Sequence, residues 1–455
     1  MSFDVRNRRV VVIGAGRSGR AAARLLRARG AEVTLTDTDA AALEREADLR
    51  ALGVRMETGA DRPEVLASAD LVVLSPGVPP NQPGIDAARR AGVPVIGEVE
   101  LASRWLAGRI VAITGTKGKS TTTTLTAGIL QEGGLAAAAG GNIGIALSEQ
   151  VADSRPDSVH VVEVSSFQLE STDRFHPWIA VLVNLSPDHL DRHATFAEYA
   201  AAKARIFRNQ APADWAVVNA DDPAALDLAR DTPARRFDFS LDAPLEDGVT
   251  VSGDQIVERR GGVSTPVMPR AVVRLPGRHL LADVLAASAV GIVAGVPPSA
   301  IARAVEKFRG LEHALEAVGE HGGVRFVNDS KATNVISARR AIESFDSGVV
   351  AIMGGRYKGG AFEDLTDAVR RRVTAIVTIG EAGDRIEAAL GSLVPVHRAA
   401  SMSDAVGRAF AAAPPGGVVL LAPACSSFDM FRDYADRGRA FKAAVAELMK
   451  ERMAQ

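Results

Sequence analysis

Residues 114–121 read TGTKGKST, and this stretch decides which fold the sequence favours. The apolar residues 110–113 predict a buried strand that enters it, and a threonine-rich helix leaves it. Such a loop points backbone N–H groups at phosphates, and the helix N-terminus favours negative charge. The spacing is a compact variant, because Ile113 stands where the full GxxxxGK[ST] pattern has a glycine. We predict a nucleotide phosphate site in which Lys119 reaches the terminal phosphates and Ser120 ligates Mg²⁺.

An acidic residue follows a second apolar run of the same predicted central sheet. Glu163 closes residues 159–162, and an acid on a strand beside the loop strand can hold or orient the metal. The alternative is a charge that stabilises a helix N-terminus. We favour the metal, because the phosphate loop lies next to it.

A polar cluster follows residues 179–184 and contains Asp188, His189, Asp191 and His193. Such a cluster at the end of a strand can ligate a metal or contact a substrate, and a solvated turn is an equally good interpretation. Further on, Lys203 lies on a helix predicted after Thr195. By itself it reads as a surface lysine.

A first glycine loop, Gly14-Ala-Gly-Arg-Ser-Gly19, also follows a strand and opens a helix, and Asp37 ends the next strand. This resembles a dinucleotide fingerprint, but its physics suits any nucleotide diphosphate. We do not favour the dinucleotide, because such motifs have false positives and a second phosphate loop competes for the role. Ser75-Pro-Gly77 ends a further strand and can complete a pocket at the same sheet edge.

Polar residues also gather after strands in the last third of the chain. Residues 328–334 read NDSKATN, residues 354–360 read GGRYKGG, and residues 426–429 read SSFD. Ligands bind at the carboxyl edge of open α/β sheets, so these three segments predict another binding edge.

Composition limits the function classes. The 455 residues suggest about three domains. A net charge of -2 leaves no excess of basic charge for nucleic acid or anionic lipid. The apolar runs are shorter than the ~20 residues of a spanning helix. We expect a cytoplasmic monomer that neither binds nucleic acid nor inserts into membranes, in which the single cysteine, Cys425, is a small buried residue.

The pattern of elements predicts an α/β protein of three domains. Residues 1–98 form a Rossmann-like domain, and residues 99–308 form a central P-loop ATPase-like parallel sheet. Residues 309–455 form a second Rossmann-like domain, after a hinge at Gly310. Between residues 235 and 274, alternating segments with Asp-Gly and Gly-Gly turns predict a small antiparallel insert in the central domain.

Taken together, these motifs resemble the Mur ligase family, in its branch that adds D-glutamate. The resemblance spans almost the whole chain, and NDSKATN with SFDMF in this order is its most specific part. The segments that carry it are 14–19, TGTKGKST, the Gly141-Asn-Ile-Gly144 turn, EVSSFQLE at 163–170, residues 188–192, NDSKATN and PACSSFDMF at 423–431.

The resemblance implies a shared mechanism. ATP phosphorylates the carboxylate of UDP-N-acetylmuramoyl-L-alanine, and the amine of D-glutamate attacks the resulting acyl phosphate. The implied cofactors are ATP, two Mg²⁺ ions and a carbamylated Lys203, whose carbamate would supply an anionic oxygen ligand. The chemistry needs charge neutralisation and alignment, which suits the residues above.

The resemblance also implies roles for particular positions. The catalytic positions are Lys119, Glu163, His189 and Lys203, and the metal ligands are Ser120, Glu163, His189 and Lys203. The ATP positions are Gly115, Thr116, Lys117, Gly118, Lys119, Ser120, Thr121, Asn142, Asp283, His313 and Asp329. The UDP-sugar positions are Gly16, Ser18, Asp37, Thr38 and Gly77, and the D-glutamate positions are Lys331, Thr333, Lys358, Ser427 and Tyr434.

The chain departs from the family pattern at several positions. Leu280 and Asp283 stand where the family usually has asparagine, and Ala314 follows His313 where it usually has arginine. Lys117 replaces the commoner asparagine, and Tyr357 replaces an aspartate. We expect these changes to affect how the adenosine is held rather than the phosphate chemistry.

Three alternatives remain. The nearest is a Mur-type ligase that adds a different amino acid. An NAD-dependent oxidoreductase would use the first glycine loop, although no His/Arg or Tyr-x-x-x-Lys pair lies beside it. A non-catalytic binding protein is suggested only by the altered adenosine residues.

Overall fold

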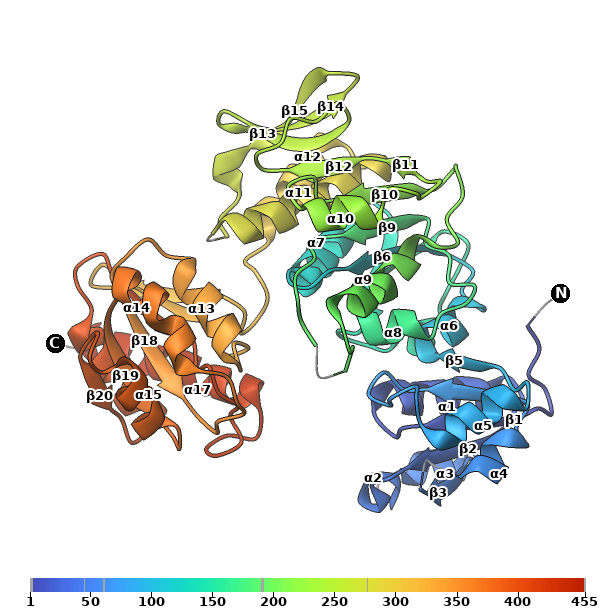
Figure 1. The fold of residues 1–455 in the computed structure, drawn as a ribbon. Helices are drawn as coiled ribbons and strands as arrows, with labels where there is room; N and C mark the ends of the chain where they lie inside the picture. The colour runs from blue at the N-terminus through green and yellow to red at the C-terminus, as the bar shows by residue number, and fades with distance from the viewer. Residues whose placement is uncertain (1–2, 45, 60–61, 190–191, 276, 454–455) are drawn as a thin grey trace. The chain divides into compact units, whose positions relative to one another are not determined.

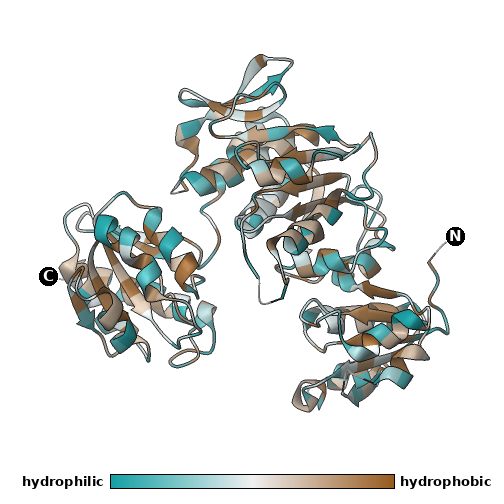
Figure 2. Cartoon of the chain, viewed as in Figure 1, coloured by the Kyte–Doolittle hydropathy of each residue, from teal (hydrophilic) through white to brown (hydrophobic). Residues whose placement is uncertain are grey.

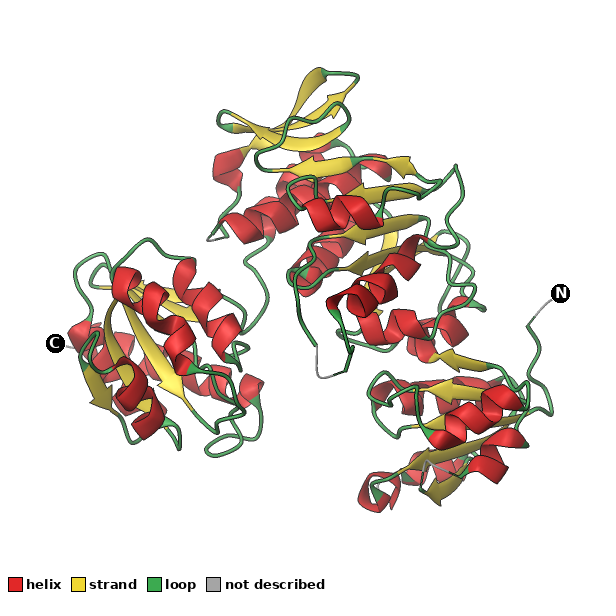
Figure 3. Ribbon diagram, in the orientation of Figure 1, coloured by secondary structure: helices red, strands yellow, loops and turns green. Residues whose placement is uncertain are grey.

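A computed structural model describes residues 3–44, 46–59, 62–189, 192–275 and 277–453. The chain forms two compact units. One comprises Met1–Val273 with Ala282–Lys307, and the other comprises Arg274–Leu281 with Phe308–Gln455, which we call the terminal unit. Figure 3 shows strands between layers of helices in both units, so the α/β prediction is confirmed.

The N-terminal part of the first unit holds a five-stranded parallel sheet of order β3-β2-β1-β4-β5 (Figure 1). Its strands are β1 Arg9–Ile13, β2 Glu32–Asp37, β3 Arg55–Thr58, β4 Leu71–Leu74 and β5 Val95–Gly97. Its helices are α1 Arg17–Ala28, α2 Ala40–Glu44, α3 Ala47–Ala51, α4 Pro63–Ala67, α5 Pro83–Arg90 and α6 Glu98–Ser103. β1 lies between β2 and β4, so the first glycine loop opens at the point where the strand order reverses, which is where open α/β sheets bind ligands.

The central part of the first unit holds a six-stranded sheet of order β11-β10-β9-β6-β8-β7. Its strands are β6 Arg109–Thr114, β7 Ala136–Gly141, β8 Ser158–Glu163, β9 Ile179–Leu182, β10 Trp215–Val218 and β11 Arg235–Arg236. Its helices are α7 Lys119–Glu132, η1 Leu147–Gln150, α8 Ser166–Glu170, α9 Phe196–Ala204, η2 Arg205–Phe207 and α10 Pro223–Leu228. β6 pairs with β8 on one side and β9 on the other. Its apolar residues are buried on both faces of the sheet, as is typical of a central parallel strand.

The insert differs in detail from the predicted antiparallel segment. Its sheet comprises β12 Asp238–Ser240, β13 Gly248–Ser252, β14 Gln255–Arg260 and β15 Val263–Pro269. β13, β14 and β15 pair antiparallel as expected, but β12 pairs parallel with β13. β11, placed in the insert by the sequence pattern, pairs with β10 and so extends the central sheet. Two residues are too few to show a strand periodicity. Helices η3 Arg270–Val272, α11 Arg278–Val293 and α12 Pro298–Lys307 follow.

The terminal unit holds a sheet of order β16-β17-β21-β18-β19-β20, in which only the edge pair β16–β17 is antiparallel. Its strands are β16 Glu316–His321, β17 Val324–Asn328, β18 Val349–Gly354, β19 Val373–Ile379, β20 Val396–Arg398 and β21 Val418–Leu421. Its helices are α13 Val335–Glu343, η4 Phe362–Leu365, α14 Thr366–Arg372, α15 Gly383–Leu390, α16 Met402–Ala412 and α17 Tyr434–Met453. The edge strands β16 and β20 are not apparent in the sequence, because their side chains are largely exposed.

Apolar side chains fill the space between sheets and helices. Figure 2 shows hydrophobic colour along many strands and hydrophilic patches on the helices around them. Cys425 is fully buried and burial raises the pKa of its thiol to about 12, so it is the inert small residue that we expected. Among the described residues, no helix is long and apolar enough to cross a membrane.

A buried carboxylate joins α6 to the segment that precedes β9. Glu100 is fully buried and accepts hydrogen bonds from the backbone N–H groups of residues 173–175, at 2.8 to 3.1 Å. Arg104 also donates to it, at 2.8 Å. Such hydrogen bonds and pairing offset the cost of burying a charge.

We predict that Glu100→Ala lowers the free energy of unfolding by about 3 kcal/mol, because it leaves the buried N–H group of Phe175, two partly buried N–H groups and a guanidinium without their acceptor. Urea unfolding followed by circular dichroism measures the loss. The exposed Glu64→Ala serves as a control and should change stability little. Equal stability of the two variants would contradict the assignment.

Candidate active site

The phosphate loop between β6 and α7 has a backbone that only glycine adopts without strain. Gly118 caps α7 with φ +83°, and a Cβ atom on it would stand 2.2 Å from Oδ1 of Asp283. Asn184, just after β9, holds the loop from the other side. Its side chain accepts from the Lys117 N–H and donates to the Lys117 carbonyl oxygen, both at 2.9 Å. The side chain of Asn184 therefore fixes the backbone of the loop at Lys117.

Two lysines converge on one carbonyl oxygen of this loop. Lys119 Nζ donates to Gly115 O at 2.9 Å, and Lys203 Nζ donates to the same oxygen at 2.8 Å. Lys203 is 1% exposed, so its interpretation as a surface lysine was wrong. It lies on the face of α9 that also buries Tyr199, and the helical pattern around it is too alanine-rich to show which face is buried.

The environment of Lys203 favours an uncharged amine. Burial, and then repulsion from Lys119, lower the pKa of Lys203 well below its usual value, although Asp188 and Glu163 act in the opposite direction. Lys203 Nζ lies 4.8 Å from the centre of the Tyr199 ring, a contact that, like the two carboxylates, favours the ammonium. A neutral amine is a nucleophile, whereas an ammonium is not.

Glu163 ends β8 beside the loop strand and is 2% exposed. Its Oε1 accepts from Nδ2 of Asn142 at 2.7 Å. Its other oxygen, Oε2, is buried and has no hydrogen-bond partner. Buried carboxylate oxygens are rarely left so, and oxygen is the ligand that Mg²⁺ prefers. The residue therefore fits a metal ligand, and Ser120 at the start of α7 can supply a second oxygen.

Asp188 and His189 lie near the phosphate loop, as their sequence position suggested. Lys117 forms an ion pair with Asp188 at 3.2 Å, and the His189 N–H donates to the Asp188 carboxylate at 3.1 Å. Burial opposes ionisation of Asp188, but Lys117, His189 and these hydrogen bonds outweigh it and lower its pKa. The His189 ring is exposed and contacts Phe167.

The rest of this cluster does not form a metal site of its own. His193 is buried, where its ring bonds to Ser166 at 3.0 Å and pairs with Glu170 at 3.2 Å, so it has a structural role. Asp191 lies outside the described residues. Within the part of the chain that the structure describes, no group of three or more His, Cys, Asp or Glu residues could hold a metal. A metal here would depend on mixed ligands such as Ser120 and Glu163.

The structure places Asp283 beneath the phosphate loop, in contact with Gly118. The side chain is 2% exposed, its Oδ2 has no hydrogen-bond partner, and burial raises its pKa well above the usual value. The neighbouring departure, Leu280, is buried in the apolar core of the terminal unit together with Val327 and Val335. A leucine suits this apolar position.

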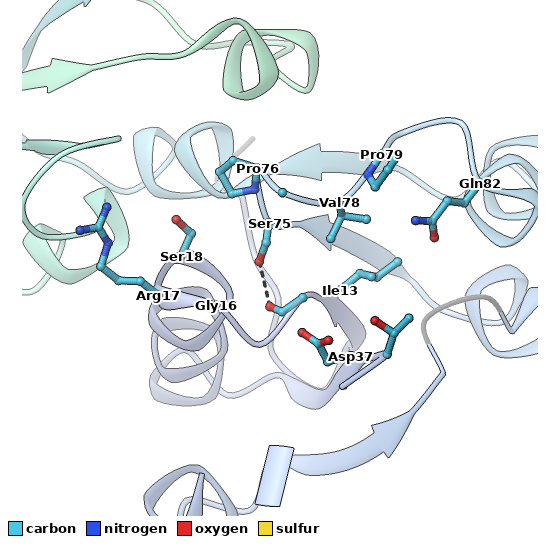
Figure 4. A pocket seen from close by; sticks show the side chains of 13 residues that line it. Ile13, Gly16, Arg17, Ser18, Asp37, Ser75, Pro76, Val78, Pro79 and Gln82 are labelled. Atoms are coloured by element: carbon cyan, nitrogen blue, oxygen red, sulfur yellow. Dashed lines mark hydrogen bonds between the residues drawn. The ribbon is translucent and has the colours of Figure 1, made fainter. Parts of the chain in front are cut away.

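The first glycine loop borders a pocket that is lined by all five residues predicted for the UDP-sugar. They are Gly16, Ser18, Asp37, Thr38 and Gly77. Figure 4 labels three of them, Gly16, Ser18 and Asp37. Asp37 accepts from the Ala15 N–H at 2.6 Å, which fixes the carboxylate at the pocket edge. Ser75 donates to Gly14 O at 2.8 Å and so ties the two walls together.

In the terminal unit, the predicted D-glutamate residues follow three neighbouring strands, β17, β18 and β21. Lys331, Lys358 and Tyr434 are exposed, Thr333 is half-buried and Ser427 is buried. Lys358 Nζ lies 5.4 Å from the centre of the Phe428 ring. Two lysines on one sheet edge suit a ligand with two carboxylates.

The two ATP positions predicted in the terminal unit are partly or fully buried. His313 is 3% exposed and bonds to Nδ2 of Asn328 at 2.9 Å. Asp329 accepts from the Leu315 N–H at 3.0 Å, and burial raises its pKa to about 7. Both therefore shape the same edge of the sheet.

Sequence reasoning missed several side chains that hold these segments. Tyr199 Oη lies 3.0 Å from Thr116 Oγ1 and burial raises its pKa to about 12. Arg437 is 1% exposed and donates to Ser330 and to the carbonyl oxygens of Cys425 and Gly354. Of the residues that hold the phosphate loop, only Asn184 could have been found from the sequence, because it ends an apolar run that predicts a strand beside the loop strand.

Models of three protein domains match the chain. The Mur ligase MurD-like N-terminal domain matches residues 8–97, the Mur ligase middle domain matches 113–291, and the Mur ligase glutamate ligase domain matches 315–425. The chain is 44% identical to the UDP-N-acetylmuramoylalanine--D-glutamate ligase of Koribacter versatilis, over 99% of each chain. It is 46% identical to the enzyme of the same name from Acidobacterium capsulatum, over 97% of each.

Solved structures show the same fold at low sequence identity. UDP-N-acetylmuramate-alanine ligase MurC from Thermotoga maritima superposes with a TM-score of 0.59 and 19% identity, over 97% of this chain and 99% of that one. A pseudomurein peptide ligase type C from Methanothermus fervidus superposes with a TM-score of 0.59 and 16% sequence identity, over 97% of this chain and 100% of that one.

We predict that Asp283→Asn stabilises the protein increasingly as pH rises from about 4 to 8. Because the pKa of Asp283 is raised on folding, its contribution to stability is complete below the unfolded pKa of about 3.9 and is lost above it. Asparagine cannot ionise, so the variant does not lose this stability as pH rises. The difference in thermal unfolding midpoint between variant and parent, measured across this range, should grow with pH. For the exposed Asp231→Asn it should stay near zero, and a difference for Asp283→Asn that does not change with pH would contradict the prediction.

Proposed function

This chain belongs to the Mur ligase family of ATP-dependent ligases of peptidoglycan precursors, and from that premise we propose that it joins D-glutamate to UDP-N-acetylmuramoyl-L-alanine. The observation that carries the proposal is the convergence of Lys119 and Lys203 on Gly115, beside the buried oxygen of Glu163. This arrangement brings a phosphate loop and an acidic side chain suited to a metal together on one sheet edge. The relatives that match over nearly the full length supply the choice of amino acid.

The residues on the phosphate loop suit phosphoryl transfer to a carboxylate. The carboxylate of the L-alanyl group attacks the terminal phosphorus of ATP, so that ADP leaves and an acyl phosphate forms. Lys119 would neutralise the developing charge on the phosphate oxygens. The backbone N–H groups at the start of α7 would align the phosphates.

The second half of the reaction needs a neutral amine. The amine of D-glutamate attacks the acyl carbon, inorganic phosphate leaves from the tetrahedral intermediate, and the amine loses a proton. Lys331 and Lys358 would bind the two carboxylates of D-glutamate, with Thr333, Ser427 and Tyr434 as hydroxyl partners. A neutral amino acid would offer these two lysines only one carboxylate.

Ser120, Glu163 and His189 would hold Mg²⁺, which neutralises phosphate charge when bound. The proposal includes two such ions and a carbamylated Lys203. The neutral amine of Lys203 attacks carbon dioxide, forms an N–C bond and loses a proton, which leaves an anionic carbamate. Burial supports this modification, because it favours the uncharged amine that the step requires.

The proposal assigns further residues to ATP. Besides the loop itself, Asn142, Asp283, His313 and Asp329 belong to this part of the proposal. UDP-N-acetylmuramoyl-L-alanine would fill the pocket beside the first glycine loop, with Asp37 and Ser18 as polar partners. We further propose that the enzyme acts as a monomer in the cytoplasm, where ATP and UDP-linked precursors are made.

An assay with a panel of amino acids tests the proposal. The protein is incubated with UDP-N-acetylmuramoyl-L-alanine, ATP, Mg²⁺ and one amino acid at a time, and phosphate release is followed. We expect release with D-glutamate and little with L-lysine, diaminopimelate or L-glutamate. Release with one of the others but not with D-glutamate would favour a different Mur-type ligase. NADH binding with hydride transfer would favour an oxidoreductase.

We expect Lys203→Ala and Lys203→Arg each to lose at least about 100-fold in activity, because neither can form a carbamate ligand. Nuclear magnetic resonance with ¹³C-labelled bicarbonate should show a carbamate carbon in the parent protein and none in the variants. Lys307→Ala, which removes an exposed lysine, is the matched control and should keep full activity. Full activity of Lys203→Arg would refute the carbamate.

A further inference from the structure

Arg17 begins α1 at the edge of the glycine-loop pocket, and its guanidinium reaches away from the pocket (Figure 4). It donates to the carbonyl oxygens of Gly144 and Asn142, the latter at 3.1 Å, with a longer contact to Gly141 at 3.5 Å. Gly141 ends β7, and the other two acceptors belong to the turn that follows it. A surface arginine that donates to carbonyl oxygens at the end of β7 and in the turn after it, more than 120 residues away in sequence, fixes that turn.

The other end of this turn is attached to Glu163. The Asn142 N–H donates to Glu163 O at 2.9 Å, and the Asn142 side chain donates to Glu163 Oε1 at 2.7 Å. This arrangement engages one carboxylate oxygen and leaves Oε2 without a hydrogen-bond partner. The position of Asn142 therefore determines which way the available oxygen of Glu163 points.

A second arginine makes a comparable connection from the opposite wall of the pocket. Arg192 donates to Val78 O at 3.1 Å, and Val78 lines the pocket. Arg192 lies three residues after His189 and pairs with Glu170 at 3.6 Å. Both walls of the pocket are thus tied by an arginine to a segment near a candidate metal ligand: one segment holds Glu163, and the other follows His189.

We propose that Arg17 is a positioning residue that couples occupancy of the glycine-loop pocket to the orientation of Glu163, acting through Asn142. The inference rests on the proposed function, in which the UDP-sugar fills this pocket and Glu163 holds Mg²⁺. A ligand that contacts the backbone of residues 16–18 immobilises the start of α1. The guanidinium then holds the turn, and the turn holds Glu163. Binding of the UDP-sugar therefore strengthens binding of the metal nucleotide by some factor. By linkage, the metal nucleotide must strengthen binding of the UDP-sugar by the same factor.

Calorimetry can separate this role from a simple contact to the ligand. The dissociation constant of UDP-N-acetylmuramoyl-L-alanine is measured with and without Mg²⁺ and a non-hydrolysable ATP analogue. In the parent protein we expect binding about fivefold tighter or more with the metal nucleotide. In Arg17→Ala and in Asn142→Ala, the ratio of the dissociation constant without the metal nucleotide to that with it should fall to about one. Arg17→Lys should be intermediate, because it keeps the charge and loses the planar fork.

Two further variants make the test specific. Arg17→Ala combined with Asn142→Ala should behave like either single variant, because residues that act in series are not additive. Arg20→Ala is the matched control, since Arg20 lies one turn further along α1 and pairs with Glu46 at 2.9 Å. It should keep the parent ratio. Thermal unfolding should show that Arg17→Ala, an exposed substitution, folds normally.

Several outcomes would overturn the inference. A parent ratio retained in Arg17→Ala, a ratio of one in an active parent protein, or additive effects of the two substitutions would each refute the coupling alone. Weaker UDP-sugar binding with an unchanged ratio would show that Arg17 is only a ligand contact. If the parent protein bound no UDP-sugar and released no phosphate with D-glutamate, the proposed function would fail and the coupling with it.

Discussion

The carbonyl oxygen of Gly115 is the point on which the rest of the site depends. Two lysines donate to it, one from the helix that follows the loop and one from α9. Two ammonium groups so close repel each other, and burial adds to the cost of the second charge. The conflict is relieved if Lys203 is uncharged. Burial and the repulsion from Lys119 lower the pKa of this amine, which lies near Glu163 and Asp188, where a cation would oppose metal binding.

Much of the fold follows from local sequence. The apolar residues around β1, β6 and β18 are buried on both faces, and such strands belong to parallel sheets covered by helices. The glycine loops after β1 and β6 mark the carboxyl edges where ligands bind. For this reason the residues of the glycine-loop pocket could be grouped correctly from sequence alone, although they come from three different strand ends.

Other features depend on contacts between distant segments and could not be predicted. The burial of Lys203 follows from the way α9 packs, and its alanine-rich sequence gives no amphipathic pattern. Asp283 meets Gly118 across more than 160 residues, so its position beneath the loop requires the tertiary structure. The short strands β11 and β12 were assigned incorrectly, because pairing partners rather than periodicity determine where such strands belong.

The late position of Asp283, α11 and α12 in the sequence affects how the phosphate loop is made during synthesis. α12 packs against α7, and Arg303 and Lys307 on it pair with Glu132 at the end of α7. The nascent chain therefore contains the complete loop sequence long before it contains the residues that cover its helix. Contacts over such long sequence separations form slowly. A ribosome that stalls within the insert would leave a chain with the nucleotide motif but with α7 uncovered, which is the kind of exposed apolar surface that chaperones bind.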